Sequence, residues 1–132
     1  MVASQEAIAS QEGLKVLQEG GNAIDAAVTV GFVLAVTLPR AGNLGGGGFM
    51  LVHIASENKT IALDYREVAP LQSQRNMYLS ETREFDPYQS RFTYKAAGVP
   101  GTVAGLFMAL DKYGTISHKR ALAPALSLAK KG

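Results

Sequence analysis

The sequence contains no cysteine among its 132 residues, which excludes disulfides and thiolate metal sites. An excess of one charge is also missing: the net charge is +2, and the basic residues are scattered rather than gathered in a stripe with aromatics. Nucleic-acid binding is therefore disfavoured, although the pI is near 9.0. Hydrophobic residues make up 47% and charged residues 18%, which is typical of a globular chain. This length suits one modest domain or part of a larger one.

Long hydrophobic runs and an export signal are missing as well. The uncharged, largely apolar run at 26–38 reaches about two thirds of the roughly 20 residues that span a bilayer. The amino terminus, MVASQEA, has no basic segment followed by an apolar core, so no signal peptide is visible. We therefore expect a buried helix at 26–38 and no direct membrane segment.

Two helices are predicted before the first glycine-rich loop. The first covers about 4–19, with Ser4 as its cap and a pair of glycines after its end. The second covers about 23–38 and begins after Asn22, which stands three residues before Asp25 in the pattern of a capping box. Because the second helix is apolar nearly all round, we expect it to be buried on most sides, with further protein covering it.

The middle of the chain predicts an antiparallel hairpin. Apolar runs rich in β-forming residues, at 49–55 and 60–65, flank the polar turn 56–59. Both runs are too apolar for a sheet that faces water, so we expect helices to cover this sheet.

The rest of the chain combines an irregular segment with two more helices. Residues 67–93 are polar, with one turn of helix expected near 75–79 and a short strand near 94–98. Helices are predicted at 102–113 and 119–130. This layout holds too few strands for a complete layered sandwich, so we expect a piece of an α/β/β/α or other α+β assembly.

A run of four glycines lies in the segment AGNLGGGGFM at 41–50. A dinucleotide-binding loop needs a strand before it and a helix after it, whereas the predicted order here is the reverse. A P-loop needs a lysine after its last glycine, and Phe49 stands there instead. We therefore favour a backbone that passes where a side chain would clash.

Arg66 is the polar residue best suited to bind a ligand. It follows the second strand of the predicted hairpin, and its planar guanidinium can bind a carboxylate through two parallel hydrogen bonds. A structural salt bridge with Glu67 or Asp64 is the alternative, and the residues alone favour that alternative.

The sequence offers no convincing nucleophile, metal site or cofactor site. His53 lies in an apolar strand, where a packing role is expected, and His118 lies in a polar turn, where it should be solvated. Two histidines without carboxylates at ligand spacing predict no metal. No G-x-S-x-G motif occurs, and Thr102 is explained by the start of a helix, so we assign no catalytic residue to this chain.

Five stretches carry a resemblance to a known family: GGNAIDAAV at 20–28, PRAGNLGGGGFM at 39–50, ALDYREVAP at 62–70, AAGVPGTVAG at 96–105 and LDKYGT at 110–115. In this order and spacing they resemble the amino-terminal part of the large subunit of γ-glutamyltransferases, also called γ-glutamyltranspeptidases or glutathione hydrolases. The common form of the third stretch has phenylalanine where Tyr65 stands. Residues 71–95 match least.

The resemblance implies an N-terminal nucleophile (Ntn) hydrolase fold, an α/β/β/α sandwich of which residues 1–132 are the N-terminal segment. Family precursors cleave themselves into large and small subunits, and the new N-terminal threonine of the small subunit attacks the γ-glutamyl amide of glutathione. The γ-glutamyl group then passes to water, an amino acid or a peptide. No counterpart of the cleavage site occurs in these residues. The implied partners are therefore γ-glutamyl compounds, including glutathione, and the small subunit of the same precursor.

One site residue transfers to this chain. The family's arginine at the position of Arg66 binds the α-carboxylate of the γ-glutamyl group, and this resemblance reverses the preference for a salt bridge. A second hypothesis is that Glu67 holds the guanidinium of Arg66 in place. The resemblance also implies a periplasmic or extracellular location. Two alternatives are a related Ntn acylase, acting on cephalosporins or poly-γ-glutamate, and a truncated, non-catalytic binding module.

Overall fold

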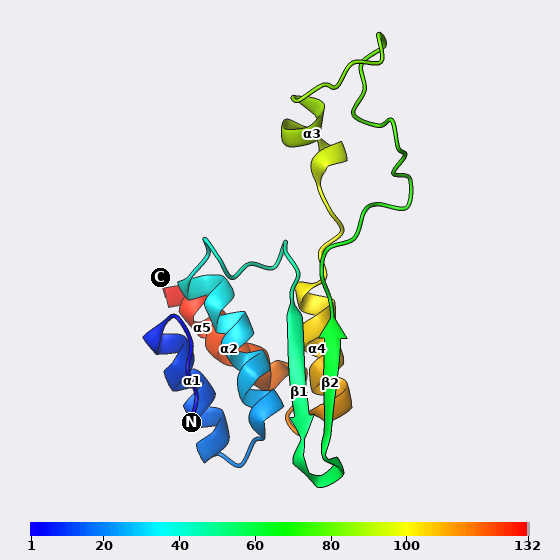
Figure 1. Cartoon of the computed structure of the whole chain (residues 1–132). Coiled ribbons are helices and arrows are strands. Elements are labelled where there is room, and N and C mark those ends of the chain that lie inside the picture. The colour runs from blue at the N-terminus through cyan, green and yellow to red at the C-terminus, as the bar shows by residue number, and fades with distance from the viewer. Residues whose placement is uncertain (132) are drawn as a thin grey trace.

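The computed structural model describes residues 1–131 and shows a helical body, a two-stranded hairpin and a protruding arm (Figure 1). The elements in chain order are α1 (Ala7–Gln18), α2 (Ala23–Thr37), β1 (Phe49–Ile54), η1 (Ala55–Glu57), β2 (Lys59–Asp64), α3 (Gln89–Phe92), η2 (Tyr94–Ala96), α4 (Thr102–Tyr113) and α5 (His118–Lys131). This mixture of helices and a small antiparallel sheet agrees with the expected α+β class.

The first helix begins later than predicted, and Ser4 is not its cap. The carboxylate of Glu6 accepts a hydrogen bond from the Ala9 N–H at 3.0 Å and caps α1 instead. The Ser4 hydroxyl donates to the Glu6 carbonyl at 2.8 Å, so Ser4 forms a local turn with the backbone just before the helix. Serine competes for nearby backbone groups in this way, and here the longer glutamate side chain reaches the helix N–H.

The second helix starts at the predicted capping box. The Asn22 side chain accepts from the N–H groups of Ile24 and Asp25, at 2.8 and 3.0 Å, and the Asp25 carboxylate accepts from the Asn22 N–H at 2.8 Å. The helix is central, as its composition predicts, because it packs against α1, α4 and α5. Its buried apolar side chains, including Val28 and Val33, join the hydrophobic core.

The hairpin forms as predicted, with pairs running from Phe49 opposite Asp64 to Ile54 opposite Lys59. Its turn is a short 3₁₀ segment, η1, followed by Asn58 in the left-handed region at φ +46°. Asparagine tolerates this conformation better than most residues.

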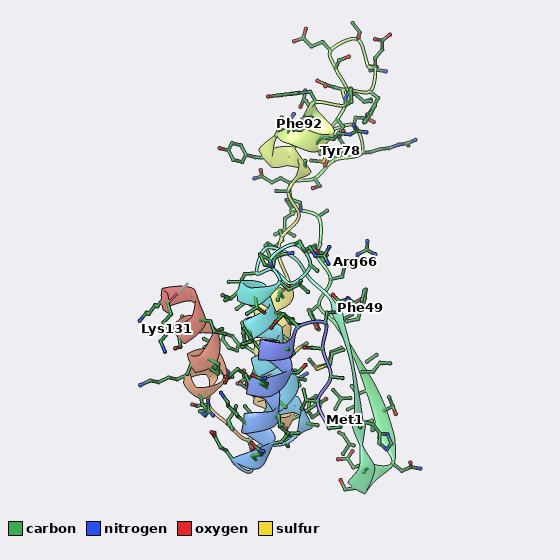
Figure 2. The ribbon with its side chains drawn as sticks, turned by 90° about the vertical axis from the view of Figure 1, so that its left-hand side faces the viewer. Met1, Phe49, Arg66, Tyr78, Phe92 and Lys131 are labelled. Atoms are coloured by element: carbon green, nitrogen blue, oxygen red, sulfur yellow. The ribbon has the colours of Figure 1, made fainter. Side chains whose placement is uncertain are left out.

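Helices cover one face of this sheet and leave the other open. Val52 and Leu63 face the helices and are 3% and 7% exposed, whereas Phe49 and Leu51, on the opposite face, are 65% and 76% exposed. The turned view in Figure 2 shows the helical body on one side of the hairpin. The expected helical cover is therefore present on one face, and the other face is open within residues 1–131, because α2 and α4 lie on the same side.

The chain between Val68 and Gly98 extends away from the body as an arm, which we define as residues 69–97 (Figure 1). The helix turn predicted near 75–79 is a set of hydrogen-bonded turns without a helix, and the short helix α3 lies elsewhere. The strand predicted at 94–98 is also wrong. The segment tightens into η2 instead, and among residues 1–131 no strand pairs with it. Val68 and Val99 form an isolated bridge at the base of the arm, and Leu79 and Phe85 form another within it.

Asp25 links two parts of the body that are far apart in sequence. Its carboxylate is fully buried and accepts three hydrogen bonds from the loop between α4 and α5: the Thr115 N–H at 2.7 Å, the Thr115 hydroxyl at 2.6 Å and the Ile116 N–H at 3.2 Å. Burial alone would raise the pKa of Asp25, but the hydrogen bonds from Thr115, Asn22 and Ile116 outweigh burial and lower it below 3.8. This carboxylate is therefore charged in the folded protein near neutral pH.

Candidate functional site

Arg66 follows β2 directly, at the root of the arm, as Figure 2 shows. Alternation along the strand places it on the open face of the sheet, in line with Ala62 and Asp64, and its side chain is exposed. Among residues 1–131 the salt bridges are Lys15–Glu12, His118–Asp111 and Arg120–Glu19, and Arg66 is in none of them. Its guanidinium is thus available to a group from outside this segment.

Neither carboxylate beside Arg66 neutralises it. Asp64 turns its Oδ1 to the backbone N–H of Arg66, at 3.0 Å, rather than to the guanidinium. Glu67 lies against the glycine loop, where its Oε1 would be 3.4 Å from a Cβ placed on Gly46. The salt bridge of Arg66 with Asp64 or Glu67, which the residues alone favoured, is therefore absent from the described residues. A contact in which Glu67 holds the guanidinium is absent from them as well.

Glycines enclose the backbone from Tyr65 to Glu67, and we call Gly47, Gly48, Gly101 and Gly105 the glycine cradle. A Cβ on Gly47 would lie 2.6 Å from both the Tyr65 carbonyl oxygen and the Glu67 nitrogen. A Cβ on Gly101 would collide with the same carbonyl, and one on Gly105 with the Tyr65 ring. Real Cβ atoms do not approach backbone this closely. The prediction that the glycine run allows close backbone passage is confirmed.

Hydrogen bonds hold this cradle together. Gly48 and Tyr65 exchange two of them, at 3.0 and 3.3 Å, which extends the hairpin ladder beyond β1. The Gly46 carbonyl accepts from the N–H groups of Gly101 and Thr102, at 2.8 and 3.0 Å. These two bonds satisfy donors at the start of α4 that the helix itself cannot pair. The glycine loop therefore joins the end of β2 to the beginning of α4.

Tyr65 points to the opposite side of the strand from Arg66. Its ring packs between Gly48 and Gly105, and its hydroxyl donates a long 3.5 Å hydrogen bond to the Phe49 carbonyl. Burial raises the pKa of Tyr65 above 10.0, so the phenol is neutral at physiological pH. The ring acts as a packed wedge that fixes the chain on which Arg66 stands.

A small cleft of about 160 Å³ borders the cradle. Asn43, Gly47, Tyr65 and Thr102 line it together with α2 side chains. Arg66 is not among the lining residues, because it faces the other side of the strand. A ligand bound to Arg66 would therefore lie over the open face of the sheet and outside this cleft.

The two histidines lie away from Arg66. His53 is on the open face of the sheet, and its Nδ1 is 3.1 Å from the Thr60 hydroxyl. His118 is exposed, as predicted, but it is the first residue of α5 rather than part of a turn. Its Nε2 lies 2.6 Å from an Asp111 oxygen, and its ring stacks on Phe107 with 4.1 Å between the ring centroids. Within residues 1–131 no three histidine or acidic side chains gather as a metal site. No helix in this part of the chain has the length and apolarity to cross a membrane.

Comparison with known proteins gives matches along the whole chain. The γ-glutamyltranspeptidase family profile matches residues 9–132. The chain is 52% identical over 132 residues to the glutathione hydrolase proenzyme of Escherichia coli K12, covering all of this chain and 23% of that protein. It therefore spans about a quarter of the length of this curated relative.

Solved structures agree with this assignment. The γ-glutamyltranspeptidase of Helicobacter pylori is 51% identical and superposes with a TM-score of 0.93, covering 100% of this chain and 38% of that chain. A cephalosporin acylase from Bacillus halodurans is 27% identical, with a TM-score of 0.82, and the match covers 99% of this chain and 24% of that one. The fold is the N-terminal portion of an α+β Ntn hydrolase. The chain belongs to the γ-glutamyltranspeptidase family.

Proposed function

We propose that residues 1–132 are the N-terminal segment of the large subunit of a γ-glutamyltransferase precursor and form part of a single larger domain. The support is the match to glutathione hydrolase proenzymes along the entire chain, combined with a sheet face that is open in residues 1–131 and exposes Phe49 and Leu51. A second layer of the sandwich would cover that face. The nucleophile comes from the small subunit of the same precursor, as in the family.

The reaction proposed for the whole enzyme is acyl transfer from a γ-glutamyl amide such as glutathione. The threonine nucleophile forms a γ-glutamyl-enzyme and releases the amine, and water or an amino acid or peptide then takes the γ-glutamyl group. A periplasmic or extracellular location is part of this proposal. The segment described here contributes binding and orientation rather than the bond-breaking group.

Arg66 is the proposed contribution, as the clamp for the α-carboxylate of the γ-glutamyl group. The observation that carries this role is an exposed guanidinium without an ion pair among residues 1–131, on a backbone fixed by the glycine cradle. A fixed backbone lowers the entropy lost when the side chain orders around its ligand. The planar fork then sets the direction of the substrate as well as its charge pairing.

The test uses the complete precursor, matured into two subunits, with a γ-glutamyl anilide as substrate. Arg66→Ala should raise KM sharply, because loss of a bidentate charged contact costs about 2–4 kcal/mol, or roughly 30- to 900-fold. Arg66→Lys should restore little, since one ammonium cannot form the fork. Arg75→Ala, the same substitution on the exposed arm, is the matched control and should leave KM unchanged. An unchanged KM in Arg66→Ala would remove this residue from the site.

The two alternatives predict different outcomes. A related acylase would process a cephalosporin or poly-γ-glutamate faster than the anilide. The sequence identities favour the γ-glutamyl substrate, because the chain is 27% identical to the cephalosporin acylase and 51–52% identical to the γ-glutamyltranspeptidase and glutathione hydrolase relatives. A non-catalytic binding module would show no turnover in any precursor that contains it. Residues 1–132 expressed alone should be inactive under the proposal, because the nucleophile lies outside them.

A further inference from the structure

The side chains of Asp64 and Arg66 lie on one face of the sheet, two residues apart, and yet do not form an ion pair in the described residues. Both are exposed, and positions two residues apart on one strand face are near enough for the long arginine side chain to reach a carboxylate. The carboxylate of Asp64 instead accepts the backbone N–H of Arg66, with 3.0 Å between nitrogen and Oδ1. Such a bond from a side chain to the N–H two residues later is an Asx turn.

The geometry of the hairpin explains why this N–H needs a partner. Tyr65 and Gly48 exchange both of their hydrogen bonds, so they form a hydrogen-bonded pair of the antiparallel ladder. The next residue along the strand, Arg66, then falls at a non-hydrogen-bonded position, where the N–H points away from β1. Asp64 supplies the acceptor that the neighbouring strand does not.

This choice of partner bears on the charge near the clamp. A carboxylate beside Arg66 would neutralise the guanidinium if the two paired, and it would repel an incoming carboxylate if it pointed the same way. When the Asp64 carboxylate is bound to the backbone, it neutralises the guanidinium less and repels an incoming carboxylate less. One of its oxygens is occupied by the Arg66 N–H, and the guanidinium of Arg66 stays free. We infer that Asp64 is a positioning residue: its Asx turn fixes the backbone of Arg66 and keeps the guanidinium open for the substrate α-carboxylate. The inference rests on the proposed role of Arg66.

Three variants in the complete, matured enzyme separate the turn from the charge. Asp64→Asn keeps the oxygen acceptor and removes the charge, so KM for the γ-glutamyl anilide should stay at the wild-type value or fall slightly. Asp64→Ala removes the acceptor, and KM should rise about five- to tenfold, the usual effect of losing one such hydrogen bond, with kcat within about twofold. Asp64→Ser, whose hydroxyl makes the same turn more weakly, should lie between them.

Controls distinguish failure of this inference from failure of the proposed function. Thr60→Ala lies on the same strand face, away from Arg66, and should leave KM unchanged. If Arg66→Ala leaves KM unchanged, the proposed function fails and the inference fails with it. If Arg66→Ala raises KM while Asp64→Ala does not, only the positioning role is overturned. A rise of tenfold or more in matured Asp64→Asn would also overturn it, and that variant decides the matter even if Asp64→Ala does not mature.

Discussion

Replacing Asp25 by alanine should destabilise the folded protein more than any change to an exposed acid. The carboxylate is fully buried and accepts four hydrogen bonds, from the N–H groups of Asn22, Thr115 and Ile116 and from the Thr115 hydroxyl. Each buried donor left without an acceptor costs about 1–3 kcal/mol. Because Asn22 and Ile116 are only partly buried and Thr115 is exposed, water can reach some of these donors, and we expect a total loss of about 3–6 kcal/mol.

Asparagine at the same position should cost less than alanine. Its oxygen can still accept from the N–H groups of Thr115 and Ile116, but its amide group faces the Asn22 N–H, a second donor. We expect a loss of about 2–3 kcal/mol. Asp111→Asn is the matched control: Asp111 pairs with His118 at the surface, where an ion pair contributes about 0–1 kcal/mol.

The same residue predicts a pH dependence. The folded-state pKa of Asp25 is lowered below 3.8, whereas the pKa of an aspartate in the unfolded chain is about 3.9. The stabilisation is therefore fully present above the unfolded pKa and is lost as pH falls through the folded pKa. The wild-type protein should lose stability below about pH 4 more steeply than Asp25→Asn, whose amide does not titrate.

Two measurements test this reasoning in the complete enzyme. Urea midpoints between pH 3 and 7 report overall stability, and amide hydrogen exchange at Thr115 and Ile116 reports the local contact. The account predicts slow exchange of these two amides in the wild type and fast exchange in Asp25→Ala. An unchanged midpoint in Asp25→Ala, or unprotected amides in the wild type, would refute the reasoning.

Two further predictions concern the glycine cradle. Gly47→Ala should block maturation or lower activity at least tenfold, because its Cβ would meet backbone atoms at 2.6 Å. Gly45→Ala should be tolerated, because the nearest neighbour of its Cβ is a side-chain atom at 3.6 Å. Equal maturation of the two variants on a gel would contradict the role of the glycine cradle. Tyr65→Phe should keep KM within about twofold and the melting temperature nearly unchanged, since it removes only a 3.5 Å hydrogen bond that contributes about 1 kcal/mol or less. Tyr65→Ala should lower both stability and substrate affinity by emptying the space between the glycines.

Local patterns predicted the regular elements of this fold well. Sequence spacing was enough to place three local features: the capping box at Asn22, the two apolar runs of the hairpin around their polar turn, and the glycine after Tyr113. The start of α1 was misplaced because Ser4 and Glu6 are both able to cap, and only the backbone geometry selects between them.

The wrong predictions in the arm and the missed hydrogen bonds between Asp25 and the loop before α5 have a different cause. The arm has no hydrophobic period, and its η2 turn and the Val68–Val99 pair depend on how two distant segments approach each other. The sequence pattern predicts Asp25 as a capping residue, but two of its hydrogen bonds come from Thr115, 90 residues away. For Arg66, the residues alone favoured a salt bridge, and only the family resemblance indicated a ligand-binding position. The three-dimensional structure shows that neither Asp64 nor Glu67 pairs with its guanidinium among residues 1–131.

The open face of the hairpin has a consequence for synthesis. If these residues begin the large subunit, they leave the ribosome before the chain that would cover Phe49 and Leu51 has been made. At about 5–20 residues per second, the rest of a protein about four times this length takes on the order of tens of seconds. During that interval the apolar side chains of Phe49 and Leu51 and the free edges of the strands are exposed, and these are features that promote aggregation. Nascent chains stalled after residue 132 should therefore bind chaperones more strongly than the same chains with Phe49 and Leu51 replaced by serine.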